Sequence, residues 1–205
     1  MKPEDARKHT DRCFRGEPAT CTFACPFRMD IRSFLDRVAR GRWPAAYRTL
    51  RDAVVFPAVV SVLCDQPCRA ACQRTLLGDE ALELRELEAA CLRNVKERKP
   101  ERYVIPPKKE RIAVVGAGPS GLSSALALAQ KRFRVTIFER GKGWGGRLRG
   151  HPRFAEFDED IGLQFSALEA EFRFGTEVRD LGELSGFDAV YVATGAGGVD
   201  FGLAA

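Results

Sequence analysis

The chain has 205 residues, of which 45% are hydrophobic and 30% charged, and its formal net charge is +5. This composition excludes an intrinsically disordered chain, and the length suffices for one large domain or two small ones. The longest apolar stretch, residues 53–60, is interrupted by Pro57 and falls far short of the roughly 20 residues that cross a bilayer, so no membrane span is expected.

Cysteines and charges are unevenly distributed along the chain. All seven cysteines lie at or before Cys91. Residues 1–110 carry 22 basic and 16 acidic side chains, a net charge of +6, whereas residues 111–205 carry 11 and 12, a net charge of −1. The N-terminus has no apolar secretory core, so a cytoplasmic location is expected, where cysteines serve as metal or cluster ligands more often than in disulfides.

This pattern predicts a basic, cysteine-rich domain over residues 1–108 and a cysteine-free domain over residues 109–205. The segment Lys99–Glu110 contains three prolines and clustered charge. Because proline fixes φ and cannot donate a backbone hydrogen bond, this segment is expected to be an extended linker.

The first domain is expected to be helical. Apolar residues recur on one face of a helix over Asp30–Arg40, with Asp30 as its N-cap and Gly41 as its stop. A second helix is expected to have Pro44 in its first turn and to run to Val54.

A third helix is predicted from about Ala81 to Lys99, and its apolar stripe consists of Leu84, Leu87, Cys91 and Val95. Such short helices bury little apolar area, so the domain would gain stability from an inorganic group.

The second domain begins with strand, turn, helix and strand. Arg111–Val115 is a β-branched run, the loop Gly116–Gly121 follows at once, and Leu122–Lys131 is an apolar helical segment. Phe133–Phe138 alternates like a second strand and ends at Glu139, 23 positions after the first glycine. This is G-x-G-x-x-G in the context of a dinucleotide-binding fold.

Each loop residue has a physical role in that fold. The first glycine, Gly116, permits a tight turn, the second, Gly118, lets a pyrophosphate approach the backbone, and the third, Gly121, lets helix and strand pack closely. The helix N-terminus supplies amide donors for the phosphates, and Glu139 would accept hydrogen bonds from the ribose.

Two later glycine segments fit the same fold. Residues 145–148 form a Gly-Gly-Arg-Leu turn, and a third strand is expected over Phe187–Val192, which runs into Ala193-Thr194-Gly195. Ordinary glycine turns are the alternative interpretation.

These features together resemble the N-terminal part of the small (β) subunit of bacterial glutamate synthase and its relatives, which include the N-terminal portion of dihydropyrimidine dehydrogenase. The stretches that carry the resemblance are Cys21–Pro26, Cys64–Cys72, Leu87-Glu88, the glycine loop, Glu139, the Gly-Gly-Arg-Leu turn and the Ala-Thr-Gly segment. The resemblance implies an α-helical iron–sulfur domain followed by an α/β Rossmann-like domain that binds FAD, with an NAD(P)H domain inserted in the latter.

The resemblance also implies two [4Fe–4S] clusters with interleaved ligands. One would be held by Cys13, Cys21 and Cys72, and the other by Cys25, Cys64, Cys68 and Glu88. Thiolates suit iron–sulfur clusters because they are soft, charged donors.

The chain departs from the family at Gly16, where the family's first motif has a cysteine. The first cluster could keep four irons with one open or small-ligand site, could be [3Fe–4S], or could be absent. Cys91 could replace a missing ligand, or it could be a buried small hydrophobe.

FAD contacts follow from the resemblance. The glycine loop and the end of the second strand would bind the adenosine and diphosphate, through Gly116, Gly118, Pro119, Ser120, Gly121, Glu139 and Arg140. The flavin side would be lined by Gly146, Arg147 and Leu148, and further contacts are expected from Ala193, Thr194 and Gly195.

The family's FAD domain is longer than the segment found here. No second glycine loop with strand and helix follows Gly195. We therefore expect a truncated FAD domain without its NAD(P)H domain, either as a fragment or as a subunit completed by another chain.

The leading interpretation is an electron-transfer module that passes electrons between FAD and the clusters to a partner oxidoreductase subunit. The alternatives are a non-catalytic docking or assembly subunit and a zinc-stabilised interaction module. No side chain indicates a general acid, base or nucleophile. His9 and His151 are expected at surface or loop positions, and the arginines of residues 28–51 are expected to form solvated faces or offset cluster charge rather than to bind nucleic acid.

Overall fold

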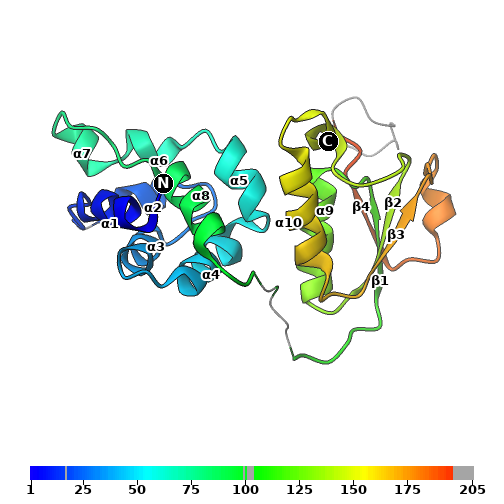
Figure 1. The fold of residues 1–205 in the computed structure, drawn as a ribbon. Helices are drawn as coiled ribbons and strands as arrows, with labels where there is room; N and C mark the ends of the chain where they lie inside the picture. Colours follow the sequence, from blue (N-terminus) through cyan, green and yellow to red (C-terminus); the bar gives the residue numbers. More distant parts are fainter. Residues whose placement is uncertain (17, 99, 101–103, 196–205) are drawn as a thin grey trace. The chain divides into compact units, whose positions relative to one another are not determined.

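The computed structural model describes residues 1–16, 18–98, 100 and 104–195, and the chain forms two compact units, Met1–Arg98 and Lys99–Ala205 (Figure 1). The first unit is helical and the second contains a parallel sheet, so the expected fold class is confirmed. Among the described residues, no helix is both long enough and apolar enough to cross a membrane. Of the expected linker, residues 99 and 101–103 lie outside the described residues, and residues 104–110 contain neither helix nor strand.

The first unit is built from short helices. In chain order they are α1 (Pro3–Asp11), α2 (Thr20–Ala24), α3 (Ile31–Ala39), α4 (Trp43–Val54), α5 (Pro57–Leu63), α6 (Pro67–Ala70), α7 (Gln73–Leu76) and α8 (Leu84–Asn94). Helices α1, α3, α4 and α8 enclose one hydrophobic core, in which Phe34, Leu50 and Leu87 are fully buried. The four short helices α2, α5, α6 and α7 carry or adjoin the cysteine-rich segments.

Helix α3 has the ends that its sequence predicts. The Asp30 carboxylate accepts hydrogen bonds from the backbone amide of Ser33 at 3.0 Å and from its hydroxyl at 2.6 Å. After the last turn the chain leaves the helix through Gly41, whose φ of +66° favours glycine. The predicted N-cap and stop are both confirmed.

Replacing Asp30 with alanine should cost about 1 kcal/mol of unfolding free energy, because a helix N-terminal amide loses its acceptor. The two hydrogen bonds from Ser33 hold the pKa of Asp30 below its ordinary value. The contribution of the carboxylate is therefore complete above the ordinary pKa and is lost as pH falls through the lower, folded-state value. Urea unfolding followed by circular dichroism checks this, with Asp30→Asn as the control that keeps an oxygen acceptor but should lose the pH dependence.

The third predicted helix is shorter than expected. Helix α8 ends at Asn94, where the side-chain amide donates to the Ala90 carbonyl at 2.8 Å. Val95 follows with an extended backbone and is buried in the core. The helix therefore ends where the chain turns to bury this side chain. The end expected at Lys99 lies outside the described residues.

The second unit is a four-stranded parallel sheet with the order β3-β2-β1-β4. Its strands are β1 (Arg111–Val115), β2 (Arg134–Glu139), β3 (Ala170–Phe174) and β4 (Ala189–Val192). The predicted helix is α9 (Pro119–Gln130), and a further helix α10 (Phe154–Phe165) follows the 3-10 turn η1 (Gly146–Gly150). The first two strands and α9 confirm the predicted strand–turn–helix–strand unit.

Helices α9 and α10 lie on the same side of this sheet (Figure 1). The connection from β3 to β4, which contains the turn η2 (Leu181–Leu184), covers the other side, where Val178 and Leu184 pack on Val115 and Phe138. The connection that follows β1 and the connection that leads to its neighbour β4 therefore lie on opposite sides of the sheet. In open parallel sheets the point where the connections change sides, at the carboxyl ends of the strands, is where ligands bind.

Candidate functional site

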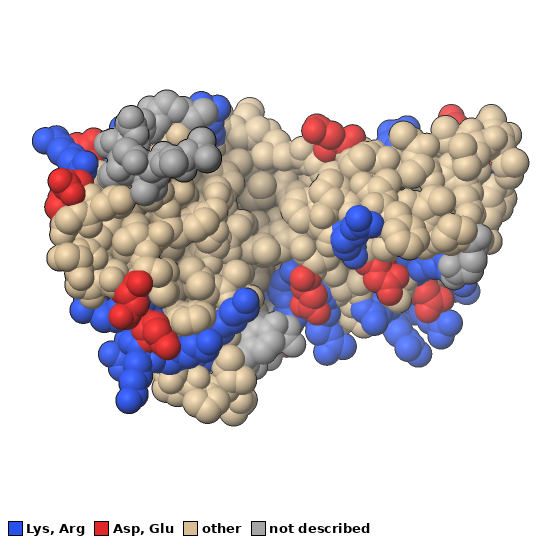
Figure 2. Space-filling model, turned by 180° about the vertical axis from the view of Figure 1, so that it is seen from behind, with Lys and Arg blue, Asp and Glu red and all other residues tan. Residues whose placement is uncertain are grey.

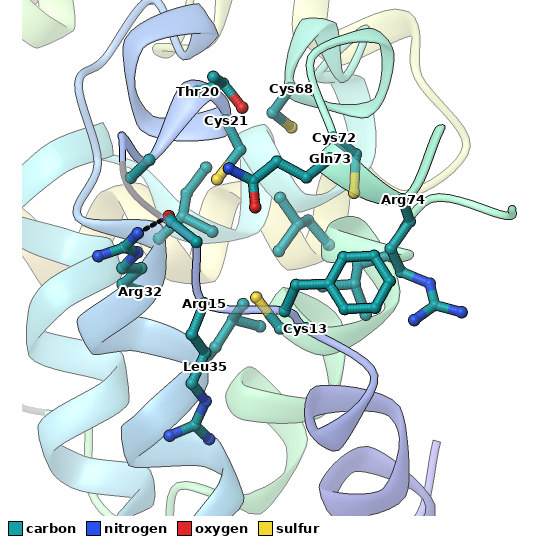
Figure 3. A pocket seen from close by; sticks show the side chains of 16 residues that line it. Cys13, Arg15, Thr20, Cys21, Arg32, Leu35, Cys68, Cys72, Gln73 and Arg74 are labelled. Atoms are coloured by element: carbon teal, nitrogen blue, oxygen red, sulfur yellow. Dashed lines mark hydrogen bonds between the residues drawn. The ribbon is translucent and has the colours of Figure 1, made fainter. Parts of the chain in front are cut away.

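Four cysteines line one cavity in the first unit (Figure 3). Cys13 lies just after α1, Cys21 in α2, Cys68 in α6, and Cys72 immediately before α7. The Thr20 hydroxyl donates to the Ala71 carbonyl at 2.6 Å, which ties the first cysteine-rich segment to the second. Residues more than 50 positions apart are thus brought to one place by these short helices.

The thiols fall into two groups by the charges that act on them. Burial raises the pKa of Cys21, and the neighbouring Cys13 and Cys72 thiolates raise it further. Burial raises the pKa of Cys68 to about 12, and the negative charges of Cys64, Glu88, Cys25 and, least, Cys21 add to that effect. Cys21 therefore interacts mainly with Cys13 and Cys72, and Cys68 mainly with Cys64, Glu88 and Cys25, although all four cavity cysteines share one space.

Glu88 is the one carboxylate in the second group. It lies on α8, is 7% exposed, and burial raises its pKa to about 7. Its Oε2 atom is buried and has no hydrogen-bond partner within the described structure. A buried acceptor without a partner costs free energy, so this oxygen is suited to a ligand that the protein alone does not supply.

The donor chemistry of these residues fits iron–sulfur clusters. All seven cysteines are free thiols, and the buried Glu88 oxygen lacks a protein partner. In the described part of the chain, no three His, Cys, Asp or Glu side chains are arranged to hold a single metal ion. In a cluster, bridging sulfides separate the irons, so its ligands stand farther apart than those of a single ion.

Cys91 is placed apart from this cavity. It is fully buried in the hydrophobic core with Leu87 and Val95, and its thiol donates weakly to the Trp43 carbonyl at 3.8 Å. Burial raises its pKa to about 12. Of the two interpretations of Cys91, a replacement ligand or a buried small hydrophobic residue, this environment matches the second.

Each of the two histidine rings accepts a hydrogen bond from a backbone amide. His9, in α1, accepts a hydrogen bond from the Glu83 amide at 2.9 Å, and His151 accepts one from the Arg153 amide at 3.1 Å. His9 is therefore a partly buried helix residue rather than a surface or loop residue.

The arginines of the first unit are interleaved with acids. On the face shown in Figure 2, basic and acidic side chains alternate along one edge instead of forming a surface of one sign. The exposed Arg40 pairs with Asp36 at 3.1 Å, and exposed pairs of this kind contribute little stability and are typical of solvated faces. Arg51 departs from this expectation, because it is only 9% exposed where it pairs with Asp52 at 2.7 Å.

A second pocket lies at the carboxyl ends of β1, β2 and β4 in the second unit. Of the residues expected to contact FAD, Gly121 and Leu148 are buried and do not line the pocket. The others line it: Gly116, Gly118, Pro119, Ser120, Glu139, Arg140, Gly146, Arg147, Ala193, Thr194 and Gly195. The structure thus brings the three glycine segments, separated in sequence, to one pocket.

The three loop glycines are required for different reasons. Gly116 has a φ of +105°, and a Cβ there would lie 2.5 Å from the Ala193 carbonyl oxygen. A Cβ on Gly121 would lie 1.9 Å from the Gly116 carbonyl oxygen. A Cβ on Gly118 would meet no protein atom within 4 Å, so the protein itself does not require glycine there.

Glu139 lines the pocket, and its carboxylate also accepts hydrogen bonds from backbone amides of the neighbouring loops. Its Oε2 accepts from the Ala117 amide at 2.8 Å, and its Oε1 accepts from the Gly141 amide at 2.7 Å. Each carboxylate oxygen can accept a second hydrogen bond, so Glu139 retains capacity for hydroxyl donors of a ligand. The Gly145 amide donates to the Ala117 carbonyl at 2.8 Å, which holds the later glycine turn against the loop.

Five lining residues were not among the contacts expected from the sequence: Val115, Phe138, Thr176, Glu177 and Val178. Val115 and Phe138 lie at the ends of the two predicted strands, whereas Thr176, Glu177 and Val178 follow β3, which the sequence analysis did not predict. Had that strand been recognised, the rule that carboxyl ends of parallel strands line the site would have indicated them.

Both units match known families. Residues 1–100 match the family described as dihydropyrimidine dehydrogenase domain II, 4Fe-4S cluster. Residues 114–173 match the family described as NAD(P)-binding Rossmann-like domain.

Among curated proteins, the chain is 33% identical to a glutamate synthase [NADPH] small chain of Mycobacterium tuberculosis, over 94% of this chain and 41% of the relative. It is 28% identical to an NADPH-Fe(3+) oxidoreductase subunit beta of Geobacter sulfurreducens, over 95% of this chain and 30% of the relative. It is 27% identical to an NADP(+)-dependent formate dehydrogenase subunit beta of Moorella thermoacetica, over 86% and 29%. The chain spans less than half the length of these relatives.

Proposed function

We propose that the chain, which matches the dihydropyrimidine dehydrogenase domain II family over residues 1–100 and is similar to a glutamate synthase small chain, is an electron-transfer module of an iron–sulfur flavoprotein oxidoreductase. It would pass electrons between FAD in the second unit and two [4Fe–4S] clusters in the first. The clusters would deliver them to a partner subunit, and an NAD(P)H-oxidising domain would supply them. The proposed location is the cytoplasm.

The nucleotide pocket would bind and orient FAD. When bound, FAD links two-electron hydride chemistry to one-electron transfer. The amides at the N-terminus of α9 would face the diphosphate, which approaches the backbone at Gly118 because no side chain blocks it. Glu139 would hold the ribose through its remaining lone pairs.

The cysteines would hold the clusters in two interleaved sets, Cys13, Cys21 and Cys72 in one and Cys25, Cys64, Cys68 and Glu88 in the other. The observation that carries this assignment is the cavity that Cys13, Cys21, Cys68 and Cys72 line together. The charges that raise the pKa of Cys21 come from Cys13 and Cys72, whereas those that raise the pKa of Cys68 come mainly from Cys64, Glu88 and Cys25, with a smaller effect from Cys21. The unpartnered Glu88 oxygen supports its place in the second set.

Quantitation of iron, sulfide and flavin in anaerobically purified and reconstituted whole chain tests this function. The expected result is several irons per chain and a flavin that binds to the pocket, measured by quenching of its fluorescence. Cys68→Ala should lose iron, whereas Cys91→Ala should keep it, because both remove a buried thiol but only Cys68 lines the cavity. Colourless, iron-free wild-type protein after reconstitution would falsify the cluster assignment.

A further inference from the structure

The cavity in the first unit contains a side-chain amide beside its thiols. Cys13, Cys21 and Cys72, the proposed ligands of one cluster, line this cavity together, but a four-iron cluster presents four irons to the protein. Gln73, the residue after Cys72, lines the same cavity. In Figure 3 its carboxamide reaches into the space that these three cysteines border.

The amide occupies the space that a side chain at position 16 would need. A Cβ built on Gly16 would lie 2.3 Å from Gln73 Oε1 and 2.8 Å from Nε2. The Nε2 atom donates to the Pro18 carbonyl at 3.3 Å, which orients the amide. Arg32 donates a hydrogen bond to the Gly16 carbonyl and so helps to fix the backbone at this position. The absence of a side chain at residue 16 and the position of Gln73 are therefore complementary.

Cys68 also lines this cavity and is the competing ligand. The charges that act on it most strongly, however, come from Cys64, Glu88 and Cys25 of the other set, and the smallest of the four effects comes from Cys21. Using Cys68 here would leave that set with a vacant position. Gln73 serves the first set without removing a ligand from the second.

Resting on the proposed function, we propose that the Gln73 Oε1 atom is the fourth protein ligand of the cluster held by Cys13, Cys21 and Cys72. A neutral amide oxygen is a harder and weaker donor to iron than a thiolate. The iron that it binds is consequently the exchangeable one. The cluster can release and regain that iron while three thiolates keep the other three.

Iron release gives a direct readout that does not depend on enzyme activity. Ferricyanide removes one electron from a [4Fe–4S]²⁺ cluster, which then releases one Fe²⁺ and becomes [3Fe–4S]⁺, so atoms and charge balance. The product has a characteristic EPR signal, and added Fe²⁺ with dithionite as the one-electron reductant reverses the step.

The test compares wild type, Gln73→Ala, Gln73→Glu and Leu76→Ala as whole chains reconstituted anaerobically. Leu76 is the matched control, since it lies on the same helix but is 73% exposed and outside the cavity lining. Gln73→Ala should contain about one iron fewer per chain and bind the exchangeable iron about tenfold more weakly. Gln73→Glu should retain that iron, and Leu76→Ala should match wild type.

A double variant distinguishes iron ligation by Gln73 from a merely structural effect of its loss. In Gly16→Cys/Gln73→Ala a thiolate replaces the amide, and the variant should resist iron loss to ferricyanide better than wild type. Equal iron content and equal release in wild type and Gln73→Ala would overturn the assignment, while the clusters of the proposed function would stand. Wild type without iron at either site would instead refute the proposed function, and this ligand with it.

Discussion

Alanine at Gly121 should destabilise the nucleotide-binding unit by about 3 kcal/mol, whereas alanine at Gly118 should change its stability by less than about 1 kcal/mol. The added Cβ at Gly121 would lie 1.9 Å from the Gly116 carbonyl oxygen, 3.0 Å from its carbon and 3.3 Å from the Ala193 Cβ. Two of these atoms belong to the backbone of the loop that joins β1 to α9. No side chain can rotate to make room, so the strand–helix turn itself must shift.

Gly118 provides the matched comparison because its Cβ would enter open space. Its φ of −78° is accessible to any residue, so alanine introduces no backbone strain. The open space is the nucleotide pocket, however, which Gly118 lines. A methyl group there should cost about 1–3 kcal/mol of binding, which is about a tenfold to a hundredfold rise in the Kd for FAD.

The two tryptophans allow these effects to be measured in the whole chain. Trp43 lies in α4 of the first unit, and Trp144 packs on Phe172 of β3 in the second, with ring centroids 5.1 Å apart. In a Trp43→Phe background, fluorescence during urea unfolding reports the second unit alone. FAD binding is followed in the same variants by flavin fluorescence. A Gly121→Ala variant as stable as its parent, or a Gly118→Ala variant with unchanged FAD affinity, would contradict the roles assigned to these glycines.

The parts of the fold that the sequence predicts are those governed by local rules. Helix α3 carries its own cap and stop at Asp30 and Gly41, and the unit from β1 to β2 follows from a glycine loop between β-branched runs. These signals lie within a few residues of the elements that they define. They need no knowledge of distant contacts.

The elements that escaped prediction depend on distant contacts. Strand β3 is only partly buried along its length, and its Phe172 and Phe174 pack on Trp144, which comes from another segment. Helix α10 buries Asp160 and Gln164, which hydrogen-bond to each other at 3.0 Å, among three buried apolar side chains, so its inner face is only partly apolar. A periodicity analysis scores such residues as exposed.

The cysteine sites show the same limit. Helices α2, α6 and α7 have only four or five residues each, too few to give a periodic signal. The approach of Gln73 to Gly16 joins residues far apart in the chain, and no local pattern marks it. The resemblance to a family supplied the ligand sets, whereas the residue that fills the gap at position 16 emerged only from the folded arrangement.

The second large effect concerns Glu88 in the metal-free chain. Burial raises its pKa from an ordinary value of 4.5 to about 7. Between these values the folded state holds a proton that the unfolded state has released, so stability falls as pH rises from about 4.5 to about 7. For a side chain only 7% exposed, the fall should amount to about 2–3 kcal/mol.

Glu88→Gln should remove this pH-dependent loss, because the amide carries no proton that ionises in this range. Urea midpoints of chelator-treated, reduced protein at pH 4.5 and pH 8 measure the effect as the difference between the two pH values, so a constant cost of the substitution cancels. Glu86→Gln is the control, as Glu86 is exposed on the same helix and should leave the difference unchanged. If Glu88→Gln kept the wild-type difference, burial of this carboxylate would not be the cause.

Iron loading should change the same measurement in a defined direction. A cation at the unpartnered Oε2 atom favours the ionised carboxylate, so the pKa of Glu88 should fall and the loss of stability between pH 4.5 and pH 8 should disappear in the loaded wild type. At pH 6 the metal-free chain still holds most of the Glu88 proton, which iron loading should release, whereas at pH 8 most of that proton is already lost. The contribution of Glu88 to proton release should therefore be smaller at pH 8, and Glu88→Gln should abolish it at both pH values. Ionising the Glu88 carboxylate is costly in the metal-free protein because it is buried and the described residues supply no hydrogen-bond partner for its Oε2 atom. The proposed ligand role explains why a carboxylate stands at this buried position.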